Sequence, residues 1–93
     1  MKAAAPHNST TSDSAWADAS GRCFFAWRMA AACEEALREV HQAMSRQQDP
    51  VRSHALEKVG SLLLHEMRRW VRRGEELDQV VDHLPKSNLA ANR

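Results

Sequence analysis

Apolar and small residues recur at alternating intervals of three and four along the first half of the chain. The series runs from Cys23 to Met44, and charged residues such as Glu35 and Arg38 occupy the other faces. Its members are Cys23, Ala26, Ala30, Cys33, Leu37, Val40 and Met44. This spacing returns to one side of a helix every seven residues and is typical of a coiled-coil seam. We therefore expect a long helix with Ser20 as its N-cap.

A second helix is predicted directly after the polar segment 45–50. Asp49 can cap its free N–H groups, and Pro50 is tolerated in the first turn. Gly74 is typical of the residue that follows the C-terminus of a helix. The apolar stripe of this helix comprises Ala55, Leu56, Val59, Leu62, Leu63, Met67, Trp70 and Val71. Both helices would have about 24 residues, and matched lengths favour an antiparallel helical hairpin.

A short third helix is expected over residues 75–84, with Pro85 ending it. The predicted fold is thus all-α: a hairpin of two long helices plus a short third one, completed to a bundle by dimerisation or by a partner. The polar composition predicts a disordered tail for residues 1–19, a helical domain for 20–85 and a flexible tail for 86–93. Trp16 is the exception in the first tail, and we expect its ring to contact either this bundle or a partner.

Large apolar residues also lie outside the seam of the first helix. Phe24, Phe25, Trp27 and Met29 point in several directions, and one neighbouring helix cannot cover them all. Together with Trp70 they are the candidate partner-binding residues. Two arrangements would cover them: a homodimer with four helices, or a groove that accepts a helix of another protein.

Four arginines surround Trp70, and this basic patch consists of Arg68, Arg69, Arg72 and Arg73. At the end of a helix these residues would oppose the negative end of its dipole, and the acidic residues after Gly74 would serve the next helix. Two further interpretations stay open. The patch can bind an acidic protein, or it can bind the phosphates of a nucleic acid.

Composition limits the remaining possibilities. The chain has 93 residues and a net charge of +1, so any basic surface must be local. Cys23 and Cys33 lie on one predicted helix about 15 Å apart, which is too far for a disulfide. The longest apolar stretch, residues 23–33, is about half of what a membrane-spanning helix needs. No secretory signal is recognisable, which indicates a cytoplasmic protein.

No catalytic, cofactor or metal-ligand motif is found in the sequence. Gly60 lies in the middle of the second predicted helix, where it is expected to allow close approach of a backbone or of a ring such as Trp27. The sequence therefore predicts a non-enzymatic interaction module, an adaptor, secretion-type chaperone or regulator, that binds a protein through an apolar helical groove. The alternative is a small regulator that associates with nucleic acid through the patch Arg68–Arg73.

Overall fold

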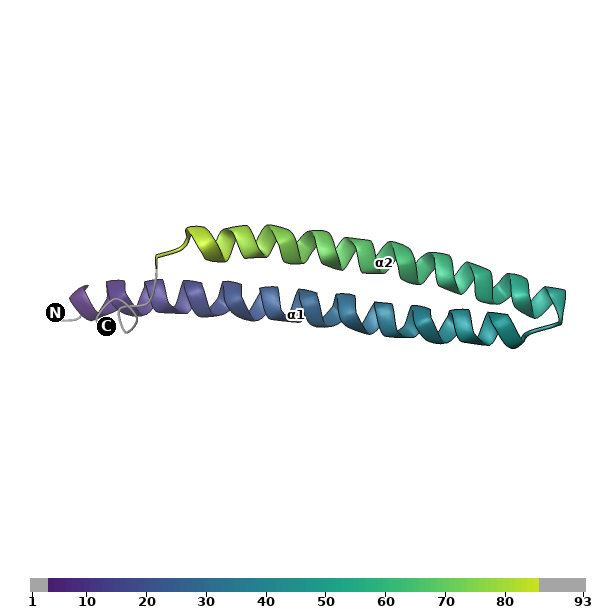
Figure 1. The fold of residues 1–93 in the computed structure, drawn as a ribbon. Coiled ribbons are helices and arrows are strands. Elements are labelled where there is room, and N and C mark those ends of the chain that lie inside the picture. The colour runs from purple at the N-terminus through teal and green to yellow at the C-terminus, as the bar shows by residue number, and fades with distance from the viewer. Residues whose placement is uncertain (1–3, 86–93) are drawn as a thin grey trace.

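Two long helices make up the part of the chain that the structure describes. A computed structural model describes the backbone of residues 4–85 and the side chains of residues 13–85. Helix α1 spans Ala4–Arg46, helix α2 spans Pro50–His83, and they lie antiparallel side by side (Figure 1). The molecule measures 71 × 26 × 16 Å. The predicted all-α class and the antiparallel hairpin are confirmed.

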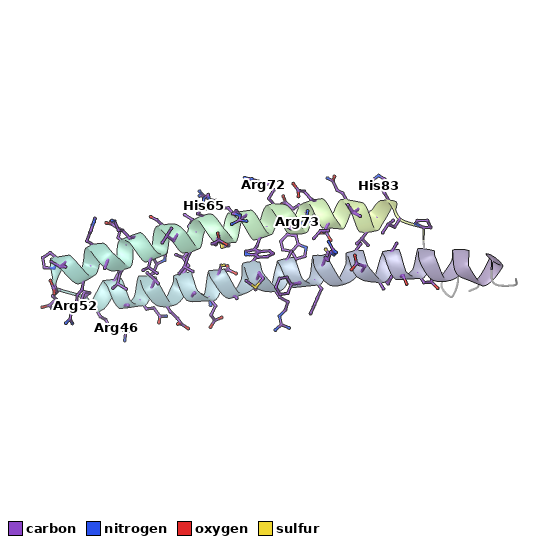
Figure 2. All side chains as sticks on the ribbon, turned by 180° about the vertical axis from the view of Figure 1, so that it is seen from behind. Arg46, Arg52, His65, Arg72, Arg73 and His83 are labelled. Carbon is purple, nitrogen blue, oxygen red and sulfur yellow. The ribbon has the colours of Figure 1, made fainter. Side chains whose placement is uncertain are left out.

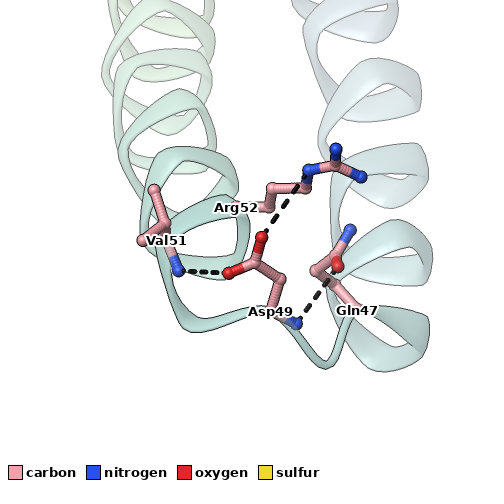
Figure 3. A network of polar contacts seen from close by, with 4 residues as sticks. All are labelled: Gln47, Asp49, Val51 and Arg52. Carbon is pink, nitrogen blue, oxygen red and sulfur yellow. Dashed lines mark hydrogen bonds and ion pairs between the residues drawn. The ribbon is translucent and has the colours of Figure 1, made fainter.

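The connection between the helices forms as the sequence predicts. The side chain of Asp49 accepts a hydrogen bond from the backbone N–H of Val51 at 3.0 Å and caps α2, whose first residue is Pro50. The backbone N–H of Asp49 in turn donates to the side-chain oxygen of Gln47 at 3.2 Å (Figure 3). These bonds satisfy polar groups that a helix terminus leaves free.

The seam of α1 is confirmed, and it consists largely of small side chains. Ala19, Cys23, Ala26, Ala30 and Cys33 are buried. The series continues through Leu37, Val40 and Met44, which are partly buried. Small residues at a helix contact allow the two helices to approach closely.

The seam of α2 differs from the predicted stripe. Its buried and partly buried members, again at intervals of three and four, are Ser53, Leu56, Gly60, Leu63, Met67, Trp70, Gly74, Leu77, Val81 and Leu84. Three residues of the predicted stripe, Ala55, Val59 and Leu62, are exposed instead. The seam passes through two glycines, which have no side chain and therefore do not appear in the hydrophobic pattern.

The predicted third helix is wrong. Residues 75–83 continue α2 without interruption, and Gly74 lies within the helix instead of ending it. No glycine of the described chain has a positive φ, the conformation that a helix-ending glycine adopts. Gly74 is buried beneath the ring of Trp27, so the absence of a side chain serves helix contact.

At the open end of the hairpin, the sequence predicts the end of α2 better than the start of α1. α2 ends at His83, and Leu84 is extended before Pro85, as the steric restriction on a residue that precedes proline requires. α1 begins at Ala4 instead of at the predicted cap Ser20. The division into residues 1–19, 20–85 and 86–93 stays a prediction, and residues 86–93 lie outside the described chain. Neither described helix contains a segment long and apolar enough to cross a membrane.

Candidate partner-binding surface

The predicted partner-binding residues of α1 are divided between two sides of the hairpin. Phe24 and Trp27 are three residues apart and share one side, whereas Phe25 and Met29 are four residues apart and share the opposite side. The seam residue Ala26, which is fully buried, lies between the two groups. The residues therefore do not form one continuous groove.

Trp27 belongs to a cluster of contacts that joins the two helices. Its ring lies against Gly74, and its indole N–H donates to Oδ2 of Asp78 at 3.2 Å. The thiol of Cys23 donates to Oδ1 of the same carboxylate at 2.9 Å. This hydrogen bond, burial, and the negative charge of Asp78 raise the pKa of the Cys23 thiol above its ordinary value. Burial and a raised pKa both lower the reactivity of a cysteine thiol.

Phe24 lies on the same side, farther from α2. Its side chain is 64% exposed, and the guanidinium of Arg28 lies 5.6 Å from the centre of its ring. This distance is within the range of a cation–π interaction. Of the two aromatic residues on this side, Trp27 stabilises the hairpin and Phe24 is the one left at the surface.

On the opposite side, Phe25 and Trp70 form the floor of an open groove. Their rings meet edge to face with centres 5.6 Å apart, and Phe25 remains 55% exposed. Arg22 of α1 and Arg73 of α2 line the same groove. The groove continues along α2 past Arg69 and Glu76. It combines apolar rings with charged rims, as the contact surfaces of proteins do.

An apolar surface extends from this groove toward the connection between the helices. Helical spacing places it on one side of both helices, and Leu62 within it is 68% exposed. We call it the Phe25 flank. Its apolar members are Phe25, Met29, Ala32, Ala36 and Ala43 of α1, and Ala55, Val59, Leu62 and Trp70 of α2.

The basic patch lies in the middle of α2, so its interpretation as a helix-end feature is wrong. Arg69 pairs with Glu66 at 2.9 Å and Arg73 pairs with Glu76 at 3.6 Å, both within the helix. Arg68 and Arg72 form no ion pair with any residue of the described chain. Figure 2 shows that Arg72 projects from the outer side of α2, away from α1. Some arginines of the patch thus lie at the Phe25 flank, and the others project into solvent.

Within residues 13–85, no group of three or more His, Cys, Asp or Glu side chains is arranged to hold a metal ion. Cys23 and Cys33 are both free and buried on one helix, in agreement with the predicted absence of a disulfide between them. What the described surface offers is exposed apolar area next to charged side chains.

Comparison with protein-family models, with curated proteins and with solved structures finds no match to this chain.

Several members of the Phe25 flank were not among the predicted site residues. No predicted feature includes Ala32, Ala36 or Ala43 of α1, and the predicted stripe of the second helix includes Val59 and Leu62. The spacing of these residues along each helix, relative to the seam, is the feature that identifies them. The alanines lie beside the confirmed seam of α1, and a seam of α2 drawn through Gly60 and Gly74 places Val59 and Leu62 on its flank.

Proposed function

We propose that the protein is a non-enzymatic helical module that binds another protein chain through the Phe25 flank. In this proposal it acts as an adaptor, a secretion-type chaperone or a regulator in the cytoplasm. Binding would complete the hairpin to a larger bundle. Four-helix bundles bury apolar surface that two helices leave open.

The proposal rests on where small and large side chains lie: small ones are buried between the helices, and large apolar ones are exposed. The buried residues are small apart from Leu77, and the described chain has no large side chain that is fully buried. Phe25 and Leu62, in contrast, are 55% and 68% exposed on one side of the molecule. A neighbouring group of exposed apolar residues is typical of an interaction surface.

The experiment compares two flank variants with a matched control. Phe25→Ala and Leu62→Ala remove exposed apolar side chains from the flank, whereas Val51→Ala removes one that is 77% exposed in the first turn of α2. Tagged chains are expressed in the native host, and the proteins purified with them are identified by mass spectrometry. We expect both flank variants to lose the same bound chain, and Val51→Ala to retain it. Equal recovery with all three variants would contradict the proposal.

The basic patch supports a second candidate, a nucleic-acid-associated regulator. The observation in its favour is that Arg68 and Arg72 lie four residues apart in mid-helix with no acidic partner in the described chain. Like charges at this spacing destabilise a helix unless something neutralises them. Fluorescence anisotropy with labelled duplex and single strands tests it. Salt-dependent binding that weakens when Arg68→Gln and Arg72→Gln are combined would favour this candidate over the first.

A further inference from the structure

The side chains of α1 on the Phe25 flank are complementary to the same side chains of a second, antiparallel α1. Consider a two-fold axis that crosses α1 between Met29 and Ala32. Residues equally far from the axis on either side then face each other. Met29 faces Ala32 of the second copy, Phe25 faces Ala36, and Arg22 faces Glu39. Large side chains meet small ones and a positive charge meets a negative one, each pair occurring twice.

Helix α2 contains a second, independent register of the same kind. An axis that crosses it between Glu66 and Arg69 places each of these residues opposite the other in the second copy. Because Glu66 and Arg69 already form an ion pair at 2.9 Å within each helix, two copies would combine four charged side chains into one network. Farther from the axis, Ala55 of one copy faces Val80 of the other, while Leu62 faces Arg73, whose aliphatic stem is apolar, and Val59 faces Glu76. Opposite charges directly facing each other fix the register of a contact.

The two registers lie at the same level of the hairpin. Cys23 contacts Gly74 near one end, with the thiol 3.7 Å from the glycine carbonyl oxygen. Leu37 lies beside Gly60 near the other end, 3.7 Å from the place a Cβ would occupy. The level halfway between these contacts is residue 30 on α1 and residue 67 on α2. One axis therefore satisfies both helices at once.

The surface has the area that a stable dimer needs. From Asp18 to Ala43 the flank of α1 is about 38 Å long, and two adjacent helices are about 20 Å wide. The flank thus presents about 750 Å² on each copy, or about 1,500 Å² in total, which is within the range of specific interfaces. The charges also favour this occupant, because Glu39 has no ion-pair partner in the described chain. Arg22, which pairs with Asp18 at 3.1 Å within its own helix, would reach Glu39 of a second copy.

We propose that the partner of the Phe25 flank is a second copy of this chain, bound antiparallel about a two-fold axis that crosses α1 near residue 30 and α2 near residue 67. This inference rests on the proposed function and specifies its partner. The resulting four-helix bundle has its two interhelical connections at opposite ends. Arg22 of each copy pairs with Glu39 of the other.

A charge-reversal series on the full chain tests the arrangement. Arg22→Glu and Glu39→Arg each place like charges opposite each other in a homodimer, so each is expected to weaken self-association about tenfold or more. The double variant restores opposite charges and is expected to dimerise like the unaltered chain. A mixture of the two single variants is also complementary, because one chain is acidic and the other basic at both positions. Sedimentation at low ionic strength, where charges are weakly screened, measures each case.

Glu34→Arg is the matched control. Glu34 is exposed on the same helix, and its spacing from Glu39 places it on the opposite side. We expect this control to leave self-association unchanged, and circular dichroism to show equal helix content in all variants. The two-fold arrangement would be overturned if the unaltered chain is monomeric. It would also be overturned if the chain dimerises and neither single charge reversal weakens its self-association. If flank variants still lose a different bound protein in that case, the proposed function stands while this inference fails.

Discussion

The two buried glycines of α2 provide a sharp test of the packing, because an added methyl group meets different surroundings at each. A Cβ at Gly60 would lie 3.6 Å from Cγ1 of Val40 and 3.7 Å from Cδ1 of Leu37, which are ordinary contact distances. A Cβ at Gly74 would lie 2.6 Å from Cε2 and 2.9 Å from Cδ2 of Trp27, which is too close for carbon atoms. The same substitution is therefore expected to have opposite effects.

The expected magnitudes follow from two opposing contributions. Replacing glycine by alanine in a helix interior stabilises by about 1 kcal/mol, and at Gly60 nothing opposes this gain. At Gly74 the indole must move, which weakens its hydrogen bond to Asp78 and forces strain of about 1 to 3 kcal/mol. We expect Gly60→Ala to stabilise by about 0.5 to 1 kcal/mol and Gly74→Ala to destabilise by up to about 2 kcal/mol.

Urea unfolding followed by circular dichroism at one fixed protein concentration measures both free energies. A double-mutant cycle identifies the cause of the loss. In a Trp27→Ala background the ring is absent, so Gly74→Ala is expected to become stabilising, with a coupling energy of at least about 1 kcal/mol. Equal effects of the two alanine substitutions, or no coupling with Trp27, would refute this account of the helix contact.

Three further predictions concern the seam, the connection and the buried thiol. Leu37→Ala and Leu63→Ala are each expected to destabilise by about 1 to 3 kcal/mol in urea unfolding, at the lower part of the usual range because both residues are only partly buried. Asp49→Ala removes the N-cap of α2 and is expected to cost about 1 kcal/mol, whereas Asp49→Asn, which retains an acceptor, costs less. The raised pKa of Cys23 means that the folded chain holds this proton to higher pH than the unfolded chain, whose thiol ionises near 9.0. The stability that this group contributes is therefore lost as pH rises above that value. Asp78→Asn is expected to lower the pH at which the thiol reacts with an alkylating reagent. An unchanged pH profile of this reaction would contradict the role of Asp78.

The hairpin was predictable because its determinants are local in the sequence. The interval of three and four from Cys23 to Met44 defines one side of α1 without any knowledge of its neighbour. Asp49 and Pro50 define the start of α2 in the same way, because a capping side chain followed by a residue without an N–H is favoured at a helix N-terminus. These features depend on helix geometry alone.

The third helix was wrongly predicted because the role of Gly74 depends on a residue far away in the chain. A glycine can end a helix or can permit a close contact, and its neighbours in the sequence do not distinguish the two. Here the ring of Trp27, 47 positions earlier, lies against Gly74, so this glycine permits a close contact. The expectation that a glycine admits this ring was correct in kind but was placed at Gly60. The same error produced the helix-end interpretation of Arg68–Arg73.

The start of α1 was misplaced for a different reason. The first residues are polar, and a polar composition alone predicts a tail instead of a helix. Trp16 and Ala19 continue the seam backward from Cys23 at intervals of three and four, and Ala19 is buried. A seam residue can be small, so the apolar content of a segment underestimates how far a helix contact extends.

The distribution of side-chain size links the stability of the hairpin to the occupation of its flank. Small residues such as Ala26 and Ala30 bring the helices together but bury little apolar area, while Phe25 and Leu62 keep most of theirs in contact with solvent. A chain that covers the flank would therefore bury large apolar side chains that the seam leaves exposed. Because such a chain binds only the folded hairpin, binding stabilises the fold by mass action. Folding and assembly are then coupled, and a substitution on the flank affects both, whereas one in the seam at Gly60 affects the hairpin itself.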